Sequence, residues 1–321
     1  MKTISEGMAE ILVPDVSLPE LGRSAGFYNP AMAENRNISI AFLSSGIKNV
    51  LDSMTAAGIR AIRYNKELGL EVTACDVNEK AIELARKNIE KNKAEVELIC
   101  GDCNAVMKER SFDAVDIDPY GSPAMFLDSA AHSANKMILV TATDTAALSG
   151  VYPAVAKRRY GILSKKCDYE KELGTRILLS SIILSCARQG KIFTPMISWQ
   201  RRHYVRIIGR VEKNRTNEKF ENLGNLYMGK LHDKESCKKA LKYLENNGLK
   251  GRALVKRALE ETETLFYYDL HILAKKYRKN IPKIDEFIER LKVSGFSASR
   301  TVFSDIAVKT DAEIKEIVEL M

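Results

Sequence analysis

The sequence predicts an α/β fold in which a mostly parallel, doubly wound sheet is followed by a smaller α+β domain. Three observations predict it. First, short apolar runs alternate with amphipathic stretches of helical period, which is typical of right-handed β–α–β units. Second, four successive runs each end in an aspartate. Third, two more β runs then follow each other directly, and the polar stretch 214–220 separates them from a helix-rich remainder.

Five short runs are the predicted parallel strands, at residues 49–53, 71–77, 95–101, 112–118 and 136–143. Helices are predicted between these strands, and another helix is predicted over residues 32–43. Residues 4–13 alternate loosely in polarity, which predicts a small strand pair before the sheet.

The β runs at 191–199 and 203–211 are predicted to close the sheet as a hairpin. Such a hairpin is unusual for dehydrogenases, but it is typical of the methyltransferase variant of the doubly wound fold, whose last strand is antiparallel. We therefore expect one domain over residues 1–213 and a second over 214–321. The irregular, basic stretch 150–170 follows the fifth strand and is expected to form a flap over the ligand edge of the sheet.

Asp76, Asp102, Asp118 and Asp144 close the second to fifth strands. Because the carboxyl ends of parallel strands meet at one edge, these carboxylates are expected to line the edge where open α/β sheets bind ligands. The turn of small residues before the first helix of the sheet contains Gly58 but no GxGxxG pattern, so it is weak support for a dinucleotide. The spacing of Asp76 suits an acid that hydrogen-bonds ribose hydroxyls.

The stretch FDAVDIDPYGSP, residues 112–123, carries the most specific chemistry. Pro119 cannot continue a central strand, and Gly121 permits a sharp turn, so Asp118 and Tyr120 are offered at the strand end. An aromatic ring can stack on a planar base, while a carboxylate and the carbonyls beside a proline accept hydrogen bonds from its amine. The plainer interpretation is an ordinary Pro-Gly turn.

Composition narrows the class of protein. The chain has 321 residues, enough for about two domains. No apolar run reaches the ~18 residues of a membrane helix, and the N-terminus lacks a signal-peptide core. We therefore expect a cytoplasmic protein without membrane contact. The pair Cys100 and Cys103 forms a CxxC, but no second CxxC and no nearby histidine accompanies it, so no metal site is expected.

Charge is unevenly distributed along the chain. Residues 1–150 have a net charge of −6 and residues 151–321 a net charge of +14. A strongly basic second half indicates a polyanionic partner, although a lysine-rich solvated surface would have the same composition. The predicted order of helix, turn, helix and β hairpin after residue 268 is like that of a winged-helix module, a common nucleic-acid binder. A generic α+β domain is the alternative.

Several motifs together resemble one known family, the tRNA guanine-26 N2-dimethyltransferases, over nearly the whole chain. They are FYNPAMAENR (27–36), VLDSMTAAGIRAIRY (50–64), CDVNEKA (75–81), GDCNAVM (101–107), DIDPYGSPAMFLDSA (116–130), TATDTAALSG (141–150), GTRIL (174–178), FYYDLHILAKK (266–276) and SASRTVFSDIAVKTDA (297–312). The resemblance implies a class I (Rossmann-like) S-adenosylmethionine-dependent methyltransferase sheet with a C-terminal tRNA-binding domain. It further implies transfer of methyl groups to N2 of guanine 26 in tRNA, and no obligate protein partner is expected.

The resemblance also implies roles for individual residues. Those at cofactor positions are Arg36, Arg60, Asp76, Asp102 and Cys103.

Asp118 is implied as the catalytic carboxylate, helped by the Pro119 carbonyl region, and Phe27 and Tyr120 are implied to sandwich the guanine. Many relatives have Phe where this chain has Tyr120, which still stacks. Some relatives have a cysteine cluster resembling a zinc site in the second domain. Only Cys237 lies there in this chain, so no zinc is expected. Val302 stands where the family pattern has a histidine.

Three other functions stay open from the residues alone. One is an amine methyltransferase acting on another RNA or DNA base, since Asp-Pro-aromatic motifs occur in such enzymes too. A second is a nucleic-acid-binding module with a vestigial cofactor pocket. A nicotinamide oxidoreductase is the weakest alternative, because the phosphate-binding glycines are missing and the first turn carries Arg60 instead.

Overall fold

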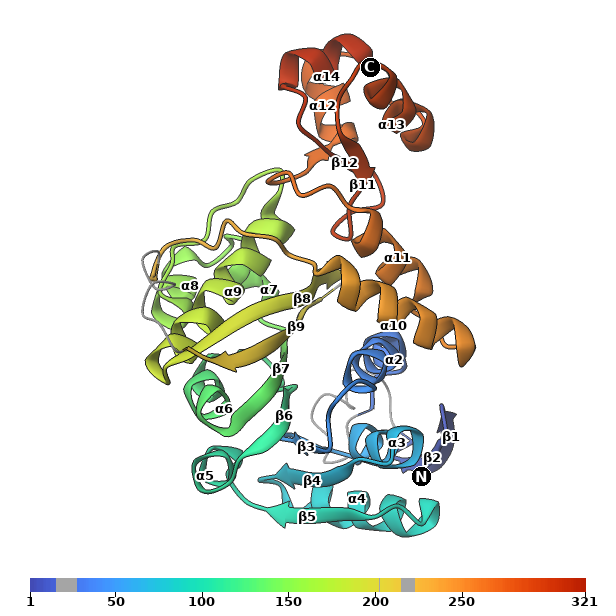
Figure 1. Ribbon diagram of the computed structural model, residues 1–321, viewed down its shortest axis with the longest axis vertical. Helices are drawn as coiled ribbons and strands as arrows, with labels where there is room; N and C mark the ends of the chain where they lie inside the picture. The colour runs from blue at the N-terminus through green and yellow to red at the C-terminus, as the bar shows by residue number, and fades with distance from the viewer. Residues whose placement is uncertain (16–27, 202, 215–222) are drawn as a thin grey trace.

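The computed structural model describes residues 1–15, 28–201, 203–214 and 223–321 (Figure 1). Its centre is a seven-stranded sheet with the strand order β5-β4-β3-β6-β7-β9-β8. The strands are β3 (Asn49–Asp52), β4 (Glu71–Asp76), β5 (Val96–Cys100), β6 (Phe112–Ile117), β7 (Ala134–Ala142), β8 (Lys191–Arg201) and β9 (Tyr204–Lys213). The first five are parallel, whereas β9 is antiparallel to both β7 and β8. The predicted parallel sheet with a closing hairpin is confirmed.

Helices cover both faces of the sheet (Figure 1). On one side lie α5 (Cys103–Glu109), α6 (Leu127–Ser133) and α9 (Glu170–Arg188). On the other lie α2 (Ala33–Leu43), α3 (Ile59–Leu68) and α4 (Glu79–Asn92), with α10 (Lys234–Asn246) packed against α2.

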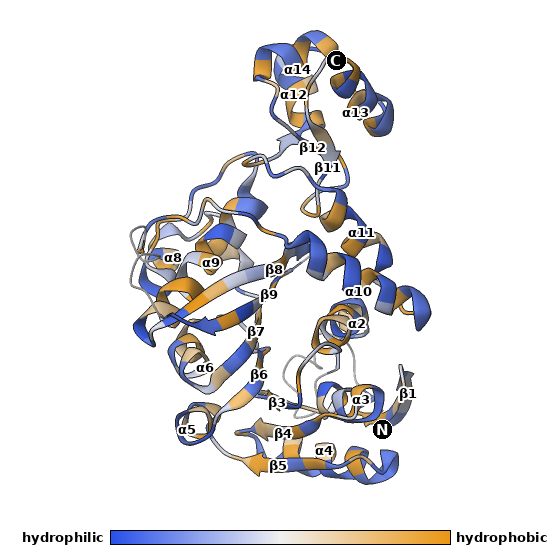
Figure 2. Ribbon diagram, viewed as in Figure 1, coloured by the Kyte–Doolittle hydropathy of each residue, from blue (hydrophilic) through white to orange (hydrophobic). Residues whose placement is uncertain are grey.

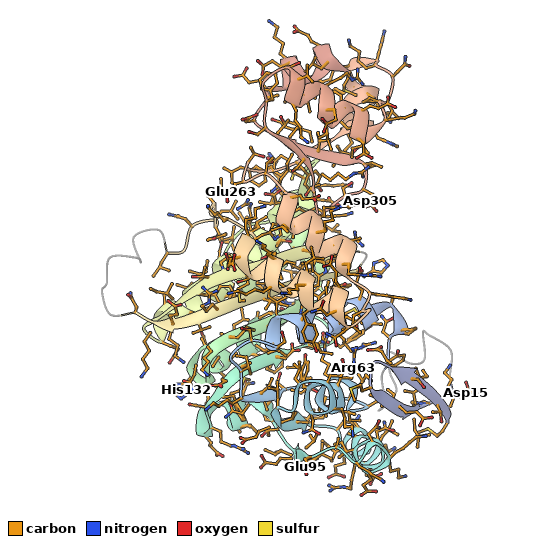
Figure 3. All side chains as sticks on the ribbon, turned by 45° about the vertical axis from the view of Figure 1, so that its right-hand side comes forward. Asp15, Arg63, Glu95, His132, Glu263 and Asp305 are labelled. Atoms are coloured by element: carbon orange, nitrogen blue, oxygen red, sulfur yellow. The ribbon has the colours of Figure 1, made fainter. Side chains whose placement is uncertain are left out.

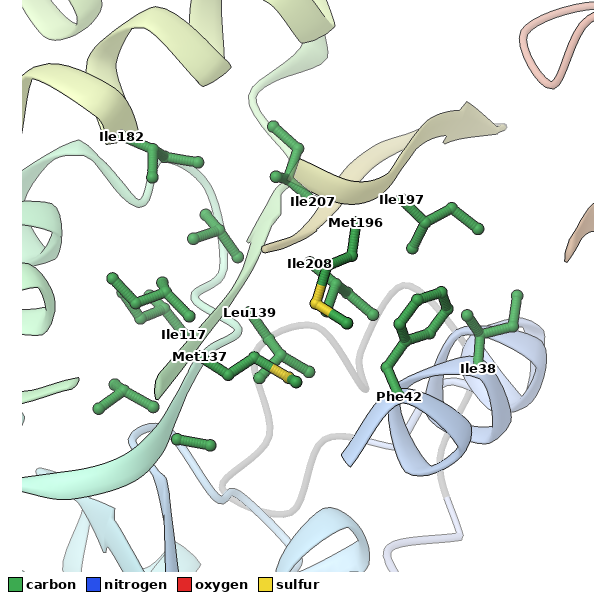
Figure 4. Close-up of a cluster of buried hydrophobic side chains, with 14 of the residues drawn as sticks. Ile38, Phe42, Ile117, Met137, Leu139, Ile182, Met196, Ile197, Ile207 and Ile208 are labelled. Carbon is green, nitrogen blue, oxygen red and sulfur yellow. The ribbon is translucent and has the colours of Figure 1, made fainter. Parts of the chain in front are cut away.

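The main core lies between these layers. Figure 4 shows Ile38 and Phe42 of α2 facing Met137, Met196 and their neighbours on the sheet. Because the parallel strands are buried on both faces, their sequences are nearly continuous apolar runs. Removing this surface from water is the main stabilisation of the sheet and of the helices packed on it.

The stretch 150–170 is not simply irregular. It contains α8 (Pro153–Tyr160), preceded by the short α7 (Thr145–Leu148). Pro153 occupies the first turn, where a proline is favoured, and alanines and basic residues of good helix propensity follow it. The helix was missed because only Ala156 and Tyr160 of α8 are buried, so its amphipathic pattern is thin.

An N-terminal hairpin lies beside the helical layer of α3 and α4. Its strands β1 (Lys2–Glu6) and β2 (Ala9–Val13) pair as predicted from the alternation of residues 4–13. The amide of Leu12 donates to the Asn88 side chain of α4 at 2.7 Å, and the Asn88 amide donates back to the Leu12 carbonyl at 3.0 Å. These two hydrogen bonds attach the hairpin to α4.

The C-terminal part contains a small three-stranded sheet, β10-β12-β11, built from β10 (Tyr268–Asp269), β11 (Ala298–Arg300) and β12 (Ala307–Thr310). Around it lie α12 (Leu270–Tyr277), α13 (Ile284–Val293) and α14 (Ile314–Leu320). These elements have a separate core, and they stand at one end of the molecule in Figure 1. Helix α10 and helix α11 (Arg252–Glu260) instead contribute buried side chains to the main core.

The helices at the surface are two-sided in polarity. Figure 2 shows hydrophilic and hydrophobic residues on different sides of α10, α11 and α13. Among the residues that the structure describes, no helix combines the length and apolar character needed to cross a membrane.

Candidate active site

The site is built around the end of β6, which places two aspartates on the same side of the sheet. Residues two apart in a strand point to the same face, so Asp116 and Asp118 both face the layer of α2 and α3. Asp116 is completely buried. Its Oδ1 accepts from Arg206 Nη1 at 2.7 Å, and its Oδ2 accepts from Arg206 Nη2 at 3.0 Å and from the Tyr64 hydroxyl at 2.5 Å.

This pairing keeps Asp116 ionised in the core. Burial acts to raise the pKa of Asp116, but the guanidinium charges of Arg206 and Arg60, with the hydrogen bonds from Arg206 and Tyr64, lower it below its ordinary value. Asp116 is therefore an ionised carboxylate that is fixed in the core, two residues before the more exposed Asp118.

Arg60 of α3 holds Asp118 in place. The Nε and Nη2 groups of Arg60 donate to Asp118 Oδ2 at 2.8 and 2.5 Å, and Nη2 also donates to Asn35 Oδ1 at 2.9 Å. The other carboxylate oxygen, Asp118 Oδ1, accepts no hydrogen bond from any residue that the structure describes. With 22% of its side chain exposed, Asp118 is a carboxylate fixed through one oxygen and open at the other.

The residues after Asp118 shape the entrance. Pro119 is buried, whereas Tyr120 is 85% exposed, so its ring is free to stack on a ligand. Gly121 has a φ of +106°, which favours glycine. Its N–H donates to Thr143 Oγ1 at 2.7 Å, which fastens the turn to the end of β7. Phe27, the predicted partner of Tyr120, lies outside the described residues.

A second group of predicted residues gathers at the ends of β4 and β5. Asp76 Oδ2 accepts from the Ala56 amide and Oδ1 from the Asn78 amide, each at 3.0 Å. The Gly101 amide donates to the Asp76 carbonyl at 3.0 Å, so the ends of the two strands lie together. Asp102 follows as the exposed N-cap of α5, and it accepts from the Asn104 amide at 2.9 Å.

The turn after β3 comes close to α4. Gly58 has a φ of +84°, and a Cβ at this position would lie 3.3 Å from the Ala85 Cβ. A larger residue would push the turn away from the strand ends. A tight turn of this kind brings backbone N–H groups and a helix start to the ligand edge even without GxGxxG.

Cys103 lies in the first turn of α5 and is buried. Burial raises the pKa of its thiol to about 12, so the thiol is protonated at neutral pH. Within the described ranges, no group of three or more His, Cys, Asp or Glu side chains could hold a metal ion.

Arg36 is engaged by a residue that sequence reasoning missed. Its Nε donates to Glu6 Oε1 at 2.6 Å, its Nη2 forms a short bond to Glu6 Oε2, and its guanidinium lies over the Tyr28 ring. Arg63, labelled in Figure 3, donates to the same Glu6 at 2.7 Å. Glu6 is thus shared by two arginines, 30 and 57 residues away in the chain.

Asp52, Asn35 and Arg206 were also missed as parts of the site. Burial, reinforced by the charge of Asp116, raises the pKa of Asp52 to about 7. The clue to Asp52 is an acid inside an apolar strand, since a buried acid needs a partner. Arg206 gives the same kind of clue, because it is a basic residue inside the apolar strand β9. Asn35 gives none, because polar residues are common on helices.

Arg60 and Asn35 each have a buried donor that makes no hydrogen bond. Arg60 Nη1 and Asn35 Nδ2 have no hydrogen-bond partner among the described residues, although Arg60 Nη1 lies 3.6 Å from Asp116 Oδ2 as an ion pair. The Asn35 amide N–H therefore remains as an unpaired buried donor beside a carboxylate site, and such donors are rare in folded proteins. A polar or anionic group of a ligand would satisfy it.

The sheet and the site together define a class of protein. Five parallel strands ending in a reversed hairpin, with carboxylates at the ends of β4, β5 and β6, form the class I (Rossmann-like) methyltransferase fold. The profile of one family, N2,N2-dimethylguanosine tRNA methyltransferase, matches residues 7–219 and 207–321. The chain belongs to this family, as the sequence motifs predicted.

Individual relatives agree over their full length. The tRNA (guanine(26)-N(2))-dimethyltransferase of Thermoplasma acidophilum is 35% identical, over 99% of this chain and 96% of its own. The enzyme of the same name from Archaeoglobus fulgidus is 32% identical, over 99% and 98%. Among solved structures, Trm1 from Pyrococcus horikoshii in complex with S-adenosyl-L-methionine superposes with a TM-score of 0.91 at 29% identity, covering 100% of this chain and 99% of that one.

Proposed function

We propose that the protein transfers methyl groups from S-adenosylmethionine to the exocyclic N2 of guanine 26 in tRNA, giving N2-methyl- and N2,N2-dimethylguanosine. The observation that carries the proposal is Asp118, held through one oxygen by Arg60 and open at the other beside the exposed ring of Tyr120. The relatives of the chain from Archaeoglobus fulgidus and Thermoplasma acidophilum are named for this reaction. On this proposal the enzyme works in the cytoplasm, where its tRNA substrate is found.

The residues at the strand ends fit the cofactor. Each oxygen of Asp76 accepts one backbone N–H and retains a lone pair, which suits the two hydroxyls of a ribose. Asp102 and Cys103 lie at the neighbouring strand end, where we place the adenine. The unpaired donor Asn35 Nδ2 suits the methionine carboxylate. When bound, S-adenosylmethionine supplies an electrophilic methyl group on a sulfonium.

Arg36 has a supporting part in this proposal. Its guanidinium already binds Glu6. We therefore propose that Arg36 joins α2 to the N-terminal hairpin and that its side chain and charge bound the cofactor site on that side. The arrangement leaves Arg60 as the arginine that contacts the reacting carboxylate.

The chain's residues activate a poor nucleophile. The lone pair of guanine N2 is delocalised into the ring, so it must be localised before N2 can attack. One N–H of the amine donates to Asp118 Oδ1, and the other donates to the carbonyl beside Pro119. As the bond between N2 and the methyl carbon forms, the bond between that carbon and the donor sulfur would break, the sulfur would keep the electron pair and leave as a neutral thioether, and a proton would pass from N2 to Asp118 Oδ1. One N–H remains after the first transfer, so a second methyl can be added in the same way.

Arg60 determines the orientation in which Asp118 enters the reaction. Although burial lowers the pKa of Arg60, the charges of Asp118 and Asp116 raise it well above its ordinary value, so the guanidinium is always charged. That fixed charge holds Asp118 Oδ2 through two hydrogen bonds and orients the free oxygen, Oδ1. Exact placement of reacting groups contributes strongly to catalysis.

Tyr120 holds the base while it is out of its helix. A guanine inside a stacked RNA cannot reach Asp118, so it must leave the stack. Stacking on an aromatic ring contributes about 1–3 kcal/mol per base, and the 85% exposed ring of Tyr120 is available for it. Phe27 is proposed as the second ring of the sandwich.

We propose that the C-terminal domain, over 214–321, binds tRNA. The distribution of exposed charges indicates which of its surfaces contacts the RNA. Four exposed cations at the end of α12 form no ion pair with any residue that the structure describes: Lys275, Lys276, Arg278 and Lys279. Helix α13 instead carries acids that form ion pairs with nearby cations, such as Asp285 with Arg300 of β11. We therefore place the tRNA backbone along the end of α12.

The test is methyl transfer to an unmodified tRNA transcript, followed by identification of the product nucleoside. Wild type is expected to form N2,N2-dimethylguanosine, and Asp118→Asn is expected to reduce the rate by about 10²–10⁴-fold while cofactor affinity is retained. Asp128→Asn, an exposed acid on α6, is the matched control and is expected to behave as wild type. A methylated adenine would refute the substrate, and full activity of Asp118→Asn would refute the catalytic role.

A further inference from the structure

Residues 150–166, here called the basic arch, form a compact surface segment around α8. The arch contains five cations and no acid. It is closed at its base by Gly150, which has a φ of +88° and lies so close to the backbone of Lys166 that a Cβ would overlap it. Ser164 is buried beside this closure and donates to the Ala147 carbonyl at 2.6 Å. The arch therefore has a defined shape and position.

A single tyrosine fastens the arch to the turn that carries Tyr120. The buried Tyr160 hydroxyl lies 2.8 Å from Ser122 Oγ and donates to Asp144 Oδ1 at 2.7 Å. Arg159 Nη1 also donates to Asp144, at 2.9 Å. Ser122 is two residues beyond Tyr120, so this contact fixes the position of the arch relative to the turn that carries Tyr120.

The outer surface of the arch is both cationic and apolar. Its exposed cations Lys157, Arg158, Lys165 and Lys166 form no ion pair with any described residue. Tyr152 is 58% exposed, and Tyr120 and Met125 of the neighbouring turn are 85% and 73% exposed. Unpaired cations beside exposed rings are the combination that binds unstacked nucleic acid, since phosphates need charge and bases need stacking surfaces.

We propose that the basic arch binds the RNA phosphates next to the target guanine, and that Tyr152 stacks on a neighbouring unpaired base. This inference rests on the proposed function and names the surface that holds the substrate for it. Removing a base from its stack costs a few kcal/mol. Backbone contacts on an element fixed to the catalytic turn hold the nucleotides on either side while the guanine enters the site. A phosphate contact of this kind sets position and affinity without reading sequence.

The test compares two pairs of cations. Lys157→Ala/Arg158→Ala removes two free cations of the arch, and Arg86→Ala/Lys87→Ala removes an exposed pair from α4 as the matched control. The affinity for unmodified tRNA transcript is measured over a range of salt concentrations, together with the kcat and KM of methyl transfer. The arch variant is expected to flatten the slope of log affinity against log salt by about 1.4–1.8. KM for tRNA rises about tenfold or more at low salt, while kcat at saturating tRNA and affinity for S-adenosylmethionine stay at wild-type values.

A second pair tests stacking. Tyr152→Ala is expected to raise KM for tRNA by about 5- to 100-fold, and Tyr152→Phe is expected to restore it. The inference is overturned if the arch variant has the same salt slope and KM as the α4 control, or if Tyr152→Phe fails as Tyr152→Ala does. Failure of the proposed function is distinct, because wild type itself would then form no dimethylguanosine on a tRNA that it binds.

Discussion

Glu6→Gln is expected to destabilise the protein strongly, although Glu6 lies in a two-stranded hairpin near the N-terminus. The Glu6 carboxylate accepts from Arg36, from Arg63 at 2.7 Å and from the Tyr28 hydroxyl at 2.8 Å, and only 8% of its side chain is exposed. Glutamine keeps the shape but removes the charge, and it turns an N–H group toward the guanidinium groups. Arg36 would then lose its carboxylate, and Arg63 would keep only the one of Glu67, to which its Nε donates at 2.6 Å.

The magnitude follows from the pKa of Glu6. Burial acts to raise this pKa, but the hydrogen bonds and charges of Arg36 and Arg63 lower it from 4.5 to about 2. This lowering corresponds to about 3 kcal/mol, which agrees with the ~3–5 kcal/mol for breaking a buried pair. Because the folded-state pKa is the lower one, this stabilisation is complete above pH 4.5 and is lost as the pH falls toward 2.

The assay is urea-induced unfolding followed by the fluorescence of Trp199, the single tryptophan of the chain, which is buried in β8. At pH 7, Glu6→Gln should lower the free energy of unfolding by about 3 kcal/mol. The difference from wild type should shrink between pH 4.5 and pH 2. The control is Glu10→Gln on the neighbouring strand, an exposed acid 3.6 Å from Lys91, which should cost less than about 1 kcal/mol. Equal stability of the two variants, or a difference independent of pH, would refute the reasoning.

Two further substitutions test the packing of the chain. Lys309→Met removes a buried ammonium 2.9 Å from Glu261 and should cost about 3–5 kcal/mol in urea unfolding. Lys283→Met, at an exposed position, should cost less than about 1 kcal/mol, and similar losses would contradict the role of the buried pair. Gly209→Ala would place a Cβ inside the Phe193 ring, so it should lower the thermal midpoint, and Phe193→Leu should recover part of the loss. No recovery in the double variant would mean that the strain lies elsewhere.

Local pattern was sufficient for the turn that carries Asp118 and Tyr120. An apolar run ending in Asp118, Pro119 and Tyr120 predicts a strand end with an exposed ring, because each step depends only on neighbouring residues. The structure has that arrangement, with Pro119 buried and Tyr120 exposed. The hairpin closing the sheet was likewise readable from two adjacent β runs.

Helix α8 was not readable in the same way. The run of lysine and arginine predicts an irregular surface, and only two of the eight residues of α8 are buried. A helix with so narrow a buried side has little periodicity to detect. Its position beside the turn after β6 depends on the hydrogen bonds of Tyr160, which join segments 16 and 38 residues apart.

The sequence by itself determined the strands, the carboxylates at their ends and the residue types offered to a base and a cofactor, because periodicity and turn chemistry act over a few residues. Only the tertiary structure decided the partners: Arg206 joins Asp116 across 90 residues, Arg60 joins Asp118 across 58, and Glu6 joins Arg63 across 57. The chain has 50 basic and 42 acidic residues, so composition permits very many pairs. The path of the folded backbone selects among them, because a buried charge is stable only where a partner reaches it.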